Sequence, residues 1–394
     1  MLKKIVCLIL AVSALCVPCL AELVPADYVF EDDMAVEVSS DTGLDVNCRS
    51  ALLMEASSGK VLFEKNIDEK LPIASVTKVM TLLIVMEAIA DGSLKLDDMV
   101  TVSENAAGMG GSQAYMEPGE QMTVHDMLKA VVVSSANDGA VALGEHIAGS
   151  EEAFVKKMNV RASELGMTST EFVNITGLDN TQVHYSTARD VAVMSRELLK
   201  HELIFNYTTI WTDSIRNGKF GLSNTNKLIR FYPGANGLKT GSTSKAKFCI
   251  SASAKRDGMQ LIAVILASPS SDERNNAAKK LFNYGFANYA VYIPPAEEIA
   301  DVPVKSGKTP FCKADFEVSD GILVLKGQEA KITRTVTVAE SLHAPIEKGQ
   351  KIGKITYYLG DKVLIEKDVC AAEAVPRLAF SDIFIILMQR LTDF

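Results

Sequence analysis

A serine and a lysine three residues apart are the first side chains in this sequence that could do chemistry together. Ser75 and Lys78 directly precede an apolar run over residues 82–86. If that run is helical, the two residues share one face of its first turn, because positions i and i+3 are neighbours on a helix. Burial lowers the pKa of a lysine, and the neutral amine can then deprotonate a neighbouring hydroxyl. The pair therefore predicts a serine nucleophile with a lysine base.

Sequence context separates this pair from two others with the same spacing. Ser57 and Lys60 lie between two strand-like runs, so we interpret them as part of a hairpin turn. Ser242 and Lys245 follow a glycine and precede a predicted strand. Only the run after Lys78 is long and apolar nearly all round, so we expect the helix over about 75–91 to be the buried centre of a domain.

A second polar motif lies between two apolar helices, which we predict over 123–133 and 140–148. Ser135 and Asn137 lie in this interruption and could project into a cleft that the helices border. A lone Ser-x-Asn is more often a helix cap, and we assign that role to Ser103-Glu104-Asn105.

The third motif is Lys239-Thr240-Gly241, which follows a glycine-rich turn. Two strands are predicted after it, over 246–254 and 259–267, joined by an Asp-Gly hairpin turn. Because Gly241 has no side chain, a ligand could approach this segment and pair with its backbone.

The three motifs, in this order and setting, resemble those of the penicillin-recognising serine enzymes. Within them the chain is most similar to the type-5 low-molecular-mass penicillin-binding proteins, the D-alanyl-D-alanine carboxypeptidases. The resemblance runs from about Val46 to Tyr289 and continues toward the C-terminus. It departs at Ala136, where glycine is frequent, and at Ser242, where a larger residue often follows. Further similar phrases are Leu71-Pro72-Ile73-Ala74-Ser75, Gly110-Gly111-Ser112-Gln113, Glu117-Pro118-Gly119-Glu120, His184-Tyr185-Ser186-Thr187-Ala188 and Asn224-Thr225-Asn226-Lys227-Leu228.

The resemblance implies an α+β fold, with an antiparallel sheet flanked by helices, and a role for each motif residue. Ser75 would attack the carbonyl of the penultimate D-alanine in the peptidoglycan stem peptide, and Lys78 would take its proton. Ser135 would relay a proton to the departing D-alanine. Asn137 would hold either the substrate amide or Lys78. Lowering a lysine pKa from about 10.4 to near neutrality costs about 4 kcal/mol, which burial and the nearby charge of Lys239 would supply.

The substrate side of the site is also implied by the resemblance. Lys239 and Thr240 would bind the terminal carboxylate beside Gly241, and Arg274 would orient it, although Arg274 could equally be a solvated charge at a helix start. The backbone N–H groups of Ser75 and Ser242 would form the oxyanion hole, where one donor is typically worth about 3–4 kcal/mol. No metal or other cofactor is required, and we expect the histidines at 125, 146 and 184 to be structural.

The ends of the chain carry different signals. Residues 1–21 have a basic start, an apolar core and a small-residue cleavage site, which predicts a signal peptide, with an uncleaved anchor as the alternative and export in either case. We expect a loose segment over 22–45, the catalytic domain over 46–292 and a small β domain over 298–372. Residues 376–394 are amphipathic and too short in their apolar core to span a bilayer, so we predict an interfacial membrane anchor, with a helix packed on the β domain as the alternative.

Charge and cysteine content exclude several classes of protein. The net charge of −9 argues against a nucleic-acid partner. The four cysteines beyond the signal peptide are far apart, which suggests neither a zinc site nor a disulfide framework, although one bridge between Cys312 and Cys370 is possible. The other two are Cys48 and Cys249.

Three other functions share these motifs. A class A serine β-lactamase needs a carboxylate for its deacylating water, and Glu171-Phe172-Val173-Asn174 lacks the usual Glu-x-x-x-Asn spacing. A D,D-endopeptidase would use the same residues on cross-linked peptides. A non-catalytic penicillin-sensing wall protein would not need to keep all four of Ser75, Lys78, Ser135 and Lys239.

Overall fold

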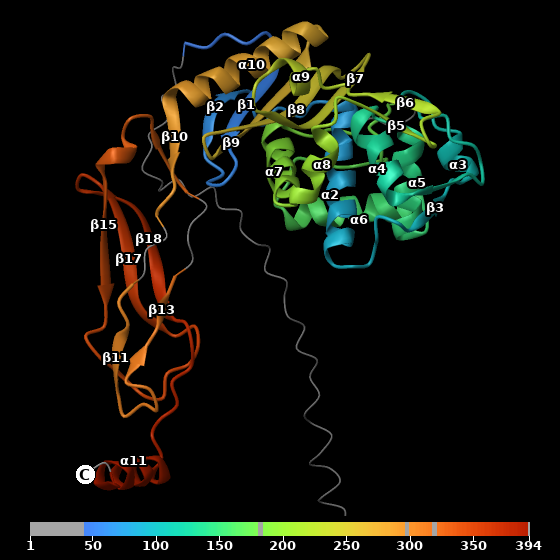
Figure 1. The fold of residues 1–394 in the computed structure, drawn as a ribbon. Helices are drawn as coiled ribbons and strands as arrows, with labels where there is room; N and C mark the ends of the chain where they lie inside the picture. The colour runs from blue at the N-terminus through green and yellow to red at the C-terminus, as the bar shows by residue number, and fades with distance from the viewer. Residues whose placement is uncertain (1–42, 180–183, 296–298, 317–320, 393–394) are drawn as a thin grey trace, which may run out of the picture.

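The computed structural model describes residues 43–179, 184–295, 299–316 and 321–392. The predicted signal peptide and residues 22–42 lie outside the described residues. Figure 1 shows an N-terminal domain of helices around a sheet, followed by an elongated C-terminal β domain and a terminal helix. This arrangement confirms the predicted α+β architecture.

The N-terminal domain is built on a five-stranded antiparallel sheet with strand order β2-β1-β9-β8-β7. Its strands are β1 (Ser50–Glu55), β2 (Val61–Lys65), β7 (Ala235–Thr243), β8 (Lys247–Arg256) and β9 (Met259–Ser268). The predicted hairpin over Ala51–Phe63 and the two predicted strands after the third motif are thereby confirmed. β7 is an edge strand, so its outer side is open to a ligand.

The sheet is buried on both faces, and alternating side chains of one strand enter two different cores. In β1, Leu52 and Met54 belong to the larger core on the helical side, whereas Ala51 and Leu53 belong to the core under α10 (Ser271–Asn288). A strand covered on both faces is apolar at successive positions, because neighbouring side chains point to opposite faces. This accounts for the uninterrupted apolar run in the sequence.

The remaining elements of the N-terminal domain are mostly helical, and most of them cover the face of the sheet opposite α10, whereas Leu228 packs into the core under α10 (Figure 1). They are η1 (Ala74–Thr77), α2 (Lys78–Ala90), β3 (Met99–Thr101), α3 (Glu104–Ala107), β4 (Gln121–Thr123), α4 (Val124–Val133), α5 (Asn137–Ala148), α6 (Glu151–Glu164), α7 (Ala188–Leu199), η2 (Glu202–Ile204), α8 (Phe205–Thr208), β5 (Thr212–Ile215), β6 (Phe220–Ser223) and α9 (Leu228–Phe231). Ser103 caps α3 by accepting from the Ala106 N–H at 2.9 Å, which confirms its predicted role as a cap.

The α2 helix is the buried centre of this domain, as its apolar sequence predicts. Ten of its side chains are buried, including Lys78. Two boundaries differ from prediction. Ser75 lies in the 3₁₀ turn η1 before α2, not in the α-helix itself, and α5 begins at Asn137 instead of Ala140. In both places the polar residues of a motif belong to the helix start, which the apolar pattern alone does not reveal.

The C-terminal domain is a set of mainly antiparallel strands, with one parallel pair between β11 and β16, and it has its own core of buried side chains. Its elements are β10 (Tyr289–Tyr292), β11 (Val302–Lys305), β12 (Phe311–Cys312), β13 (Ala314–Asp315), β14 (Ile322–Leu325), η3 (Glu329–Lys331), β15 (Ile332–Val338), β16 (Leu342–His343), β17 (Lys351–Leu359) and β18 (Lys362–Ala371). The described cysteines at 48, 249, 312 and 370 are all free thiols, so the possible Cys312–Cys370 bridge is not formed.

The two domains are joined through a short sheet. β10 continues directly from α10 and pairs with β14 of the C-terminal domain. Within β14, Leu323 packs into the core under α10, whereas Ile322 and Val324 pack into the core of the C-terminal domain. One strand thus contributes to both cores, which fixes the β domain against the N-terminal domain.

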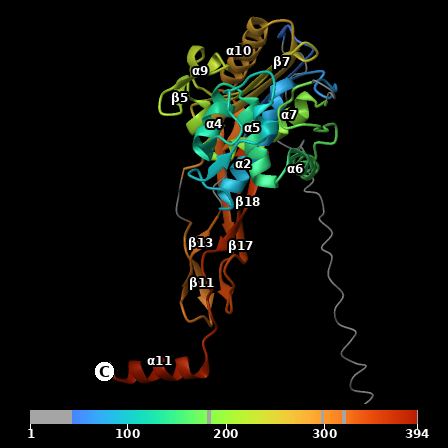
Figure 2. The ribbon, with the colours of Figure 1, turned by 90° about the vertical axis from the view of Figure 1, so that its right-hand side faces the viewer.

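The terminal helix α11 (Phe380–Thr392) lies at the end of the β domain farthest from the N-terminal domain in both views (Figures 1 and 2). Lys308 forms an ion pair with Asp382 of this helix at 3.1 Å, which connects the helix to that end of the β domain. Its large apolar side chains remain exposed, including Phe380 at 84%. Among the described residues, no helix is long and apolar enough to cross a membrane.

Candidate active site

The structure brings Ser75 and Lys78 into direct contact. The Lys78 Nζ lies 3.0 Å from the Ser75 Oγ, as the spacing predicts. Lys78 is fully buried, whereas Ser75 is partly exposed and can meet a substrate. The 3₁₀ turn and the start of α2 therefore present a hydroxyl at the surface with an amine beneath it.

Two carbonyl oxygens complete the surroundings of the Lys78 amine. The Nζ lies 2.5 Å from the Asn137 Oδ1 and 3.1 Å from the backbone oxygen of Thr176. A neutral amine has two N–H groups and one lone pair, and a carbonyl oxygen can only accept. Because the two carbonyls take both N–H groups, the lone pair is left for the Ser75 hydroxyl. This geometry suits a lysine that removes the serine proton.

The electrostatics favour the neutral form of this lysine. Burial lowers the pKa of Lys78 well below its usual value, and the nearby charge of Lys239 lowers it further. The Asp138 carboxylate acts in the opposite direction. Desolvation is the leading cause, as the burial of α2 predicts.

Ser135 and Asn137 lie where two helices meet. Ser135 follows α4 and is held at φ +67°, a conformation that costs a non-glycine residue energy and is typical of functional sites. Asn137 begins α5 and is 2% exposed. Its Nδ2 donates to the Gly110 backbone oxygen at 2.6 Å, while its Oδ1 faces Lys78. Of the two predicted partners of Asn137, the structure places Lys78 in contact.

Asp138, next to these residues, stabilises the neighbouring segment over residues 110–116. Its carboxylate accepts hydrogen bonds from the backbone N–H groups of Ala114 and Met116 at 3.0–3.1 Å, and it is 1% exposed. Arg216 also contacts this segment, because its guanidinium donates hydrogen bonds to the Ala114 and Tyr115 backbone oxygens. The same guanidinium forms an ion pair with Glu120. The segment over 110–116 is thus fixed on both sides.

Lys239 and Thr240 lie on β7 at the edge of the sheet. Lys239 is 1% exposed, and its Nζ donates to the Thr240 backbone oxygen at 3.0 Å. Burial and the charge of Arg274 lower the pKa of Lys239 to about 7. The Thr240 hydroxyl lies 2.7 Å from the hydroxyl of Thr225, which is exposed. Cation and hydroxyls together can bind a carboxylate.

Arg274 lies in the first turn of α10 and is 5% exposed. Its guanidinium donates to the Asn275 Oδ1 at 3.0 and 3.2 Å, and to the Cys249 backbone oxygen at 3.5 Å. Burial lowers its pKa to about 10. The alternative of a solvated surface charge is therefore wrong: this is a buried cation close enough to Lys239 to affect its titration.

Gly241 is required by close packing within the protein. A Cβ at this position would lie 2.8 Å from the Ser75 backbone nitrogen and 2.8 Å from the Ile73 backbone oxygen. The space left by the missing side chain is filled by η1 itself. Gly241 therefore lets β7 lie directly against the backbone around Ser75.

The sequence patterns did not reveal three chemical groups that contribute to the site. They are the hydroxyl of Thr225, the carbonyl oxygen of Thr176 and the carboxylate of Asp138. Thr225 lies in a phrase that supported the resemblance, but its contact with Thr240 spans 15 positions and leaves no local pattern. The Thr176 carbonyl belongs to the backbone and carries no sequence signal at all.

His184 lies 2.5 Å from the Thr77 Oγ1, and burial lowers its pKa to about 4.

Comparison with known proteins gives consistent matches over nearly the whole described chain. Residues 34–270 match the family model described as D-alanyl-D-alanine carboxypeptidase, and residues 295–377 match the C-terminal domain of penicillin-binding protein 5. D-alanyl-D-alanine carboxypeptidase DacF of Bacillus subtilis is 44% identical over 84% of this chain and 87% of its own length. DacC of Escherichia coli is 33% identical over 90% of both chains.

A solved structure supports the same relationship. Penicillin-binding protein 5 from Haemophilus influenzae superposes with a TM-score of 0.71 at 30% identity, covering 85% of this chain and 99% of that one. The two family models together span the three motifs and the C-terminal domain. The chain belongs to the D-alanyl-D-alanine carboxypeptidase family of serine-type, penicillin-binding hydrolases.

Proposed function

We propose that this enzyme removes the terminal D-alanine from peptidoglycan stem peptides through an acyl-enzyme on Ser75. The observation that carries the assignment is the position of the Lys78 amine, between two carbonyl acceptors and the Ser75 hydroxyl. A general base must lie within hydrogen-bond reach of the proton that it removes, and its pKa must be near the working pH. Lys78 meets the first condition, and burial shifts its pKa downward, in the direction that the second requires.

In the first half-reaction, the Ser75 Oγ attacks the penultimate D-alanine carbonyl while its proton passes to Lys78. The N–H groups of Ser75 and Ser242 stabilise the developing oxyanion. The C–N bond then breaks, and Ser135 transfers a proton to the departing amine. D-Alanine leaves, and the penultimate residue remains as an ester on Ser75.

The carboxylate of the departing D-alanine binds where the positive charge is concentrated. Lys239, Thr240 and Arg274 supply two cations and a hydroxyl there, and burial makes each interaction stronger than in water. Water then hydrolyses the ester with Lys78 as the base, which regenerates the free serine. Penicillin acylates the same serine and is held by the same groups.

The experiment that tests this function is the release of D-alanine from a D-Ala-D-Ala tripeptide by the wild type and by Ser75→Ala. The wild type should release D-alanine and be labelled by a fluorescent penicillin, and Ser75→Ala should do neither. If the wild type is labelled but releases none, the protein is a penicillin sensor or an endopeptidase instead.

A β-lactamase function is disfavoured by the residues near the nucleophile. Glu171 is exposed and lies in an isolated bridge with Tyr185. The Asn174 Oδ1 accepts from the N–H groups of Thr176 and Gly177, which occupies it in the loop that supports Lys78. Slow release of bound penicillin, over minutes or longer, is therefore expected.

We further propose that the enzyme is exported and rests on the outer face of the cytoplasmic membrane through α11. Six of its large apolar side chains are 44–84% exposed, namely Phe380, Ile383, Phe384, Ile385, Leu387 and Met388. Burying four or five of them at about 1.5–3 kcal/mol each would hold the protein reversibly at a lipid interface. The β domain would then stand between the membrane and the N-terminal domain (Figure 2).

Deletion of residues 376–394 tests the anchor. The shortened protein should move from the membrane fraction to the soluble fraction and keep its rate of D-alanine release. Retention in the membrane fraction would refute the anchor. As a matched control, Lys308→Ala removes the ion pair to Asp382 but leaves the apolar face intact, so it should remain with the membrane.

A further inference from the structure

His184 is a buried histidine that the mechanism above does not use. It is 5% exposed and lies just before α7, in contact with the 3₁₀ turn η1 that carries the nucleophile. Its ring packs edge to face against Phe172, with 5.8 Å between the ring centroids. Because burial lowers the pKa of His184 to about 4, the ring is neutral at neutral pH. A neutral imidazole has one N–H donor and one nitrogen that accepts.

The hydrogen bonds around this ring show which nitrogen donates. The Thr77 hydroxyl donates to the Ala74 backbone oxygen at 2.8 Å, because a carbonyl oxygen can only accept. A hydroxyl has one hydrogen, so the Thr77 Oγ1 must accept from the His184 Nε2, 2.5 Å away. The His184 Nδ1 is then the acceptor, and the Val173 N–H faces it at 3.5 Å. Both contacts agree with one tautomer, and they form a network from His184 through Thr77 to Ala74.

The Ala74 carbonyl at the end of this network is also restrained from a second side. A Cβ on Gly177 would overlap the Ala74 backbone oxygen and would lie 2.7 Å from the Thr77 Oγ1. Ala74 has a φ of +47°, a conformation that costs a non-glycine residue energy and persists only where the surroundings impose it. Thr77 and Gly177 therefore fix this carbonyl in one orientation.

The orientation of this carbonyl determines where the Ser75 N–H points. The Ala74 oxygen and the Ser75 N–H belong to one planar trans peptide unit, so they point in opposite directions. The oxygen faces Thr77 and Gly177, and the N–H therefore points away from them. On the nitrogen side lies β7, where a Cβ on Gly241 would be 2.8 Å from the Ser75 nitrogen.

We propose that His184 is a positioning residue for the oxyanion hole: through Thr77 it fixes the Ala74–Ser75 peptide, so that the Ser75 N–H is aimed before the substrate arrives. The proposal rests on the proposed function, in which this N–H stabilises the developing oxyanion. A donor that is already oriented needs no reorganisation during the reaction, which is why such donors contribute strongly to catalysis. His184 acts only through Thr77 and takes no part in proton transfer.

The test breaks the network at each of its two side chains and then restores it. Thr77→Val and His184→Leu each remove a hydrogen-bonding group. Both should lower kcat for D-alanine release and the rate of acylation by a fluorescent penicillin about 10- to 100-fold, because an oxyanion donor is misplaced. KM should stay within about threefold, since the lost interaction is made only in the transition state. Thr77→Ser and His184→Gln keep a hydroxyl and an N–H donor, so they should recover most of the lost rate.

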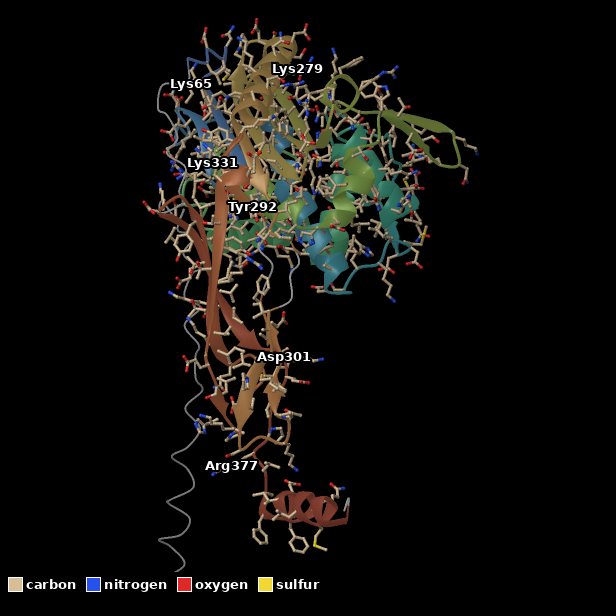
Figure 3. All side chains as sticks on the ribbon, turned by 60° about the vertical axis from the view of Figure 1, so that its left-hand side comes forward. Lys65, Lys279, Tyr292, Asp301, Lys331 and Arg377 are labelled. Atoms are coloured by element: carbon tan, nitrogen blue, oxygen red, sulfur yellow. The ribbon has the colours of Figure 1, made fainter. Side chains whose placement is uncertain are left out.

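A peptide boronic acid that ends in D-boroalanine gives a second readout. Its tetrahedral adduct with Ser75 places an oxygen in the oxyanion hole, so its inhibition constant should rise by the factor by which kcat/KM falls. The matched control is Thr356→Val in β17, which removes a buried hydroxyl that donates to Glu366 at 3.2 Å. Figure 3 shows the C-terminal domain, with Asp301 and Arg377 labelled, extending away from the N-terminal domain. This control should keep the wild-type kcat and boronate affinity even if its melting temperature falls.

Melting temperatures identify the folded variants, and one folded variant at either side chain is sufficient for the comparison. A wild-type kcat and acylation rate in folded Thr77→Val or His184→Leu would overturn the proposal. A loss in Thr77→Ser and His184→Gln as large as in the apolar variants would also overturn it, because the hydrogen bonds would then not be the cause. If the wild type released no D-alanine, the proposed function would fail, while the acylation rates would still decide the role of His184.

Discussion

Gly241→Ala tests whether the close approach of β7 to η1 sets the geometry of the oxyanion hole. The new Cβ would lie 2.8 Å from the Ser75 nitrogen, 2.8 Å from the Ile73 oxygen and 2.9 Å from the Val76 nitrogen. All three atoms are backbone atoms, so none can rotate away. Ordinary contact begins at about 3.4 Å, so the strand and the turn must separate by about 0.6 Å.

This displacement moves the Ser242 N–H away from the Ser75 N–H. Loss of one oxyanion donor costs about 10²–10³ in kcat, and misplacement by about 1 Å costs about 10². We therefore expect kcat/KM for D-alanine release to fall between about tenfold and hundredfold, with a similar fall in the rate of penicillin acylation. Overpacking should lower the free energy of unfolding by about 1–3 kcal/mol.

The measurements are D-alanine release, acylation by a fluorescent penicillin and denaturant unfolding. Gly221→Ala is the matched control, because a Cβ on that β6 residue has no heavy atom within 4 Å beyond its immediate chain neighbours. It should leave all three quantities within about twofold of the wild type. If Gly241→Ala is acylated at the wild-type rate, the close approach does not position the oxyanion hole.

Three further predictions follow from the hydrogen bonds and charges of the site. The alkaline limb of the pH profile of kcat/KM should fall near pH 7, where Lys239 loses its charge, while burial lets Lys78 lose its proton well below its usual pKa; Lys239→Arg should shift that alkaline limb upward, and an unchanged limb would contradict this role of Lys239. Asp138→Ala leaves the buried backbone N–H groups of Ala114, Met116 and Gly139 without this acceptor, which should cost about 2–5 kcal/mol in urea unfolding; a cost under 1 kcal/mol would contradict this role. Thr225→Val removes the partner of the Thr240 hydroxyl and should raise KM severalfold with little change in kcat, so an unchanged KM would show that Thr225 does not support carboxylate binding.

Local patterns in the sequence were sufficient for many of the elements, whereas the chemical roles came from the resemblance to a family. The apolar run after Lys78 predicted a buried helix, and two apolar runs around an Asp-Gly turn predicted β8 and β9. These predictions succeed because burial constrains the polarity of residues that are neighbours in the sequence. The spacing of Ser75 and Lys78 fixed their contact for the same reason, since both lie within one helical turn.

The sequence predicted less accurately where a helix begins when its first residues are polar. We expected α5 to begin at Ala140, but it begins at Asn137, because the Asn137 side chain is satisfied by Gly110 and Lys78 instead of serving as an exposed cap. The possible bridge between Cys312 and Cys370 also failed, since both thiols are free. Each outcome depends on contacts between distant segments.

The sequence by itself determined the three motifs, the contact between Ser75 and Lys78, and the two-domain α+β architecture. Only the tertiary structure decided what surrounds them. The acceptors of Lys78 lie 59 and 98 positions away along the chain, and the hydroxyl beside Thr240 lies 15 positions away. Contacts of this kind are set by how β7, η1 and the loops pack, and packing between distant segments imposes no period on the sequence. For that reason the Ser75–Lys78 pair could be predicted from the sequence, whereas the carbonyl acceptors around the Lys78 amine had to come from the fold.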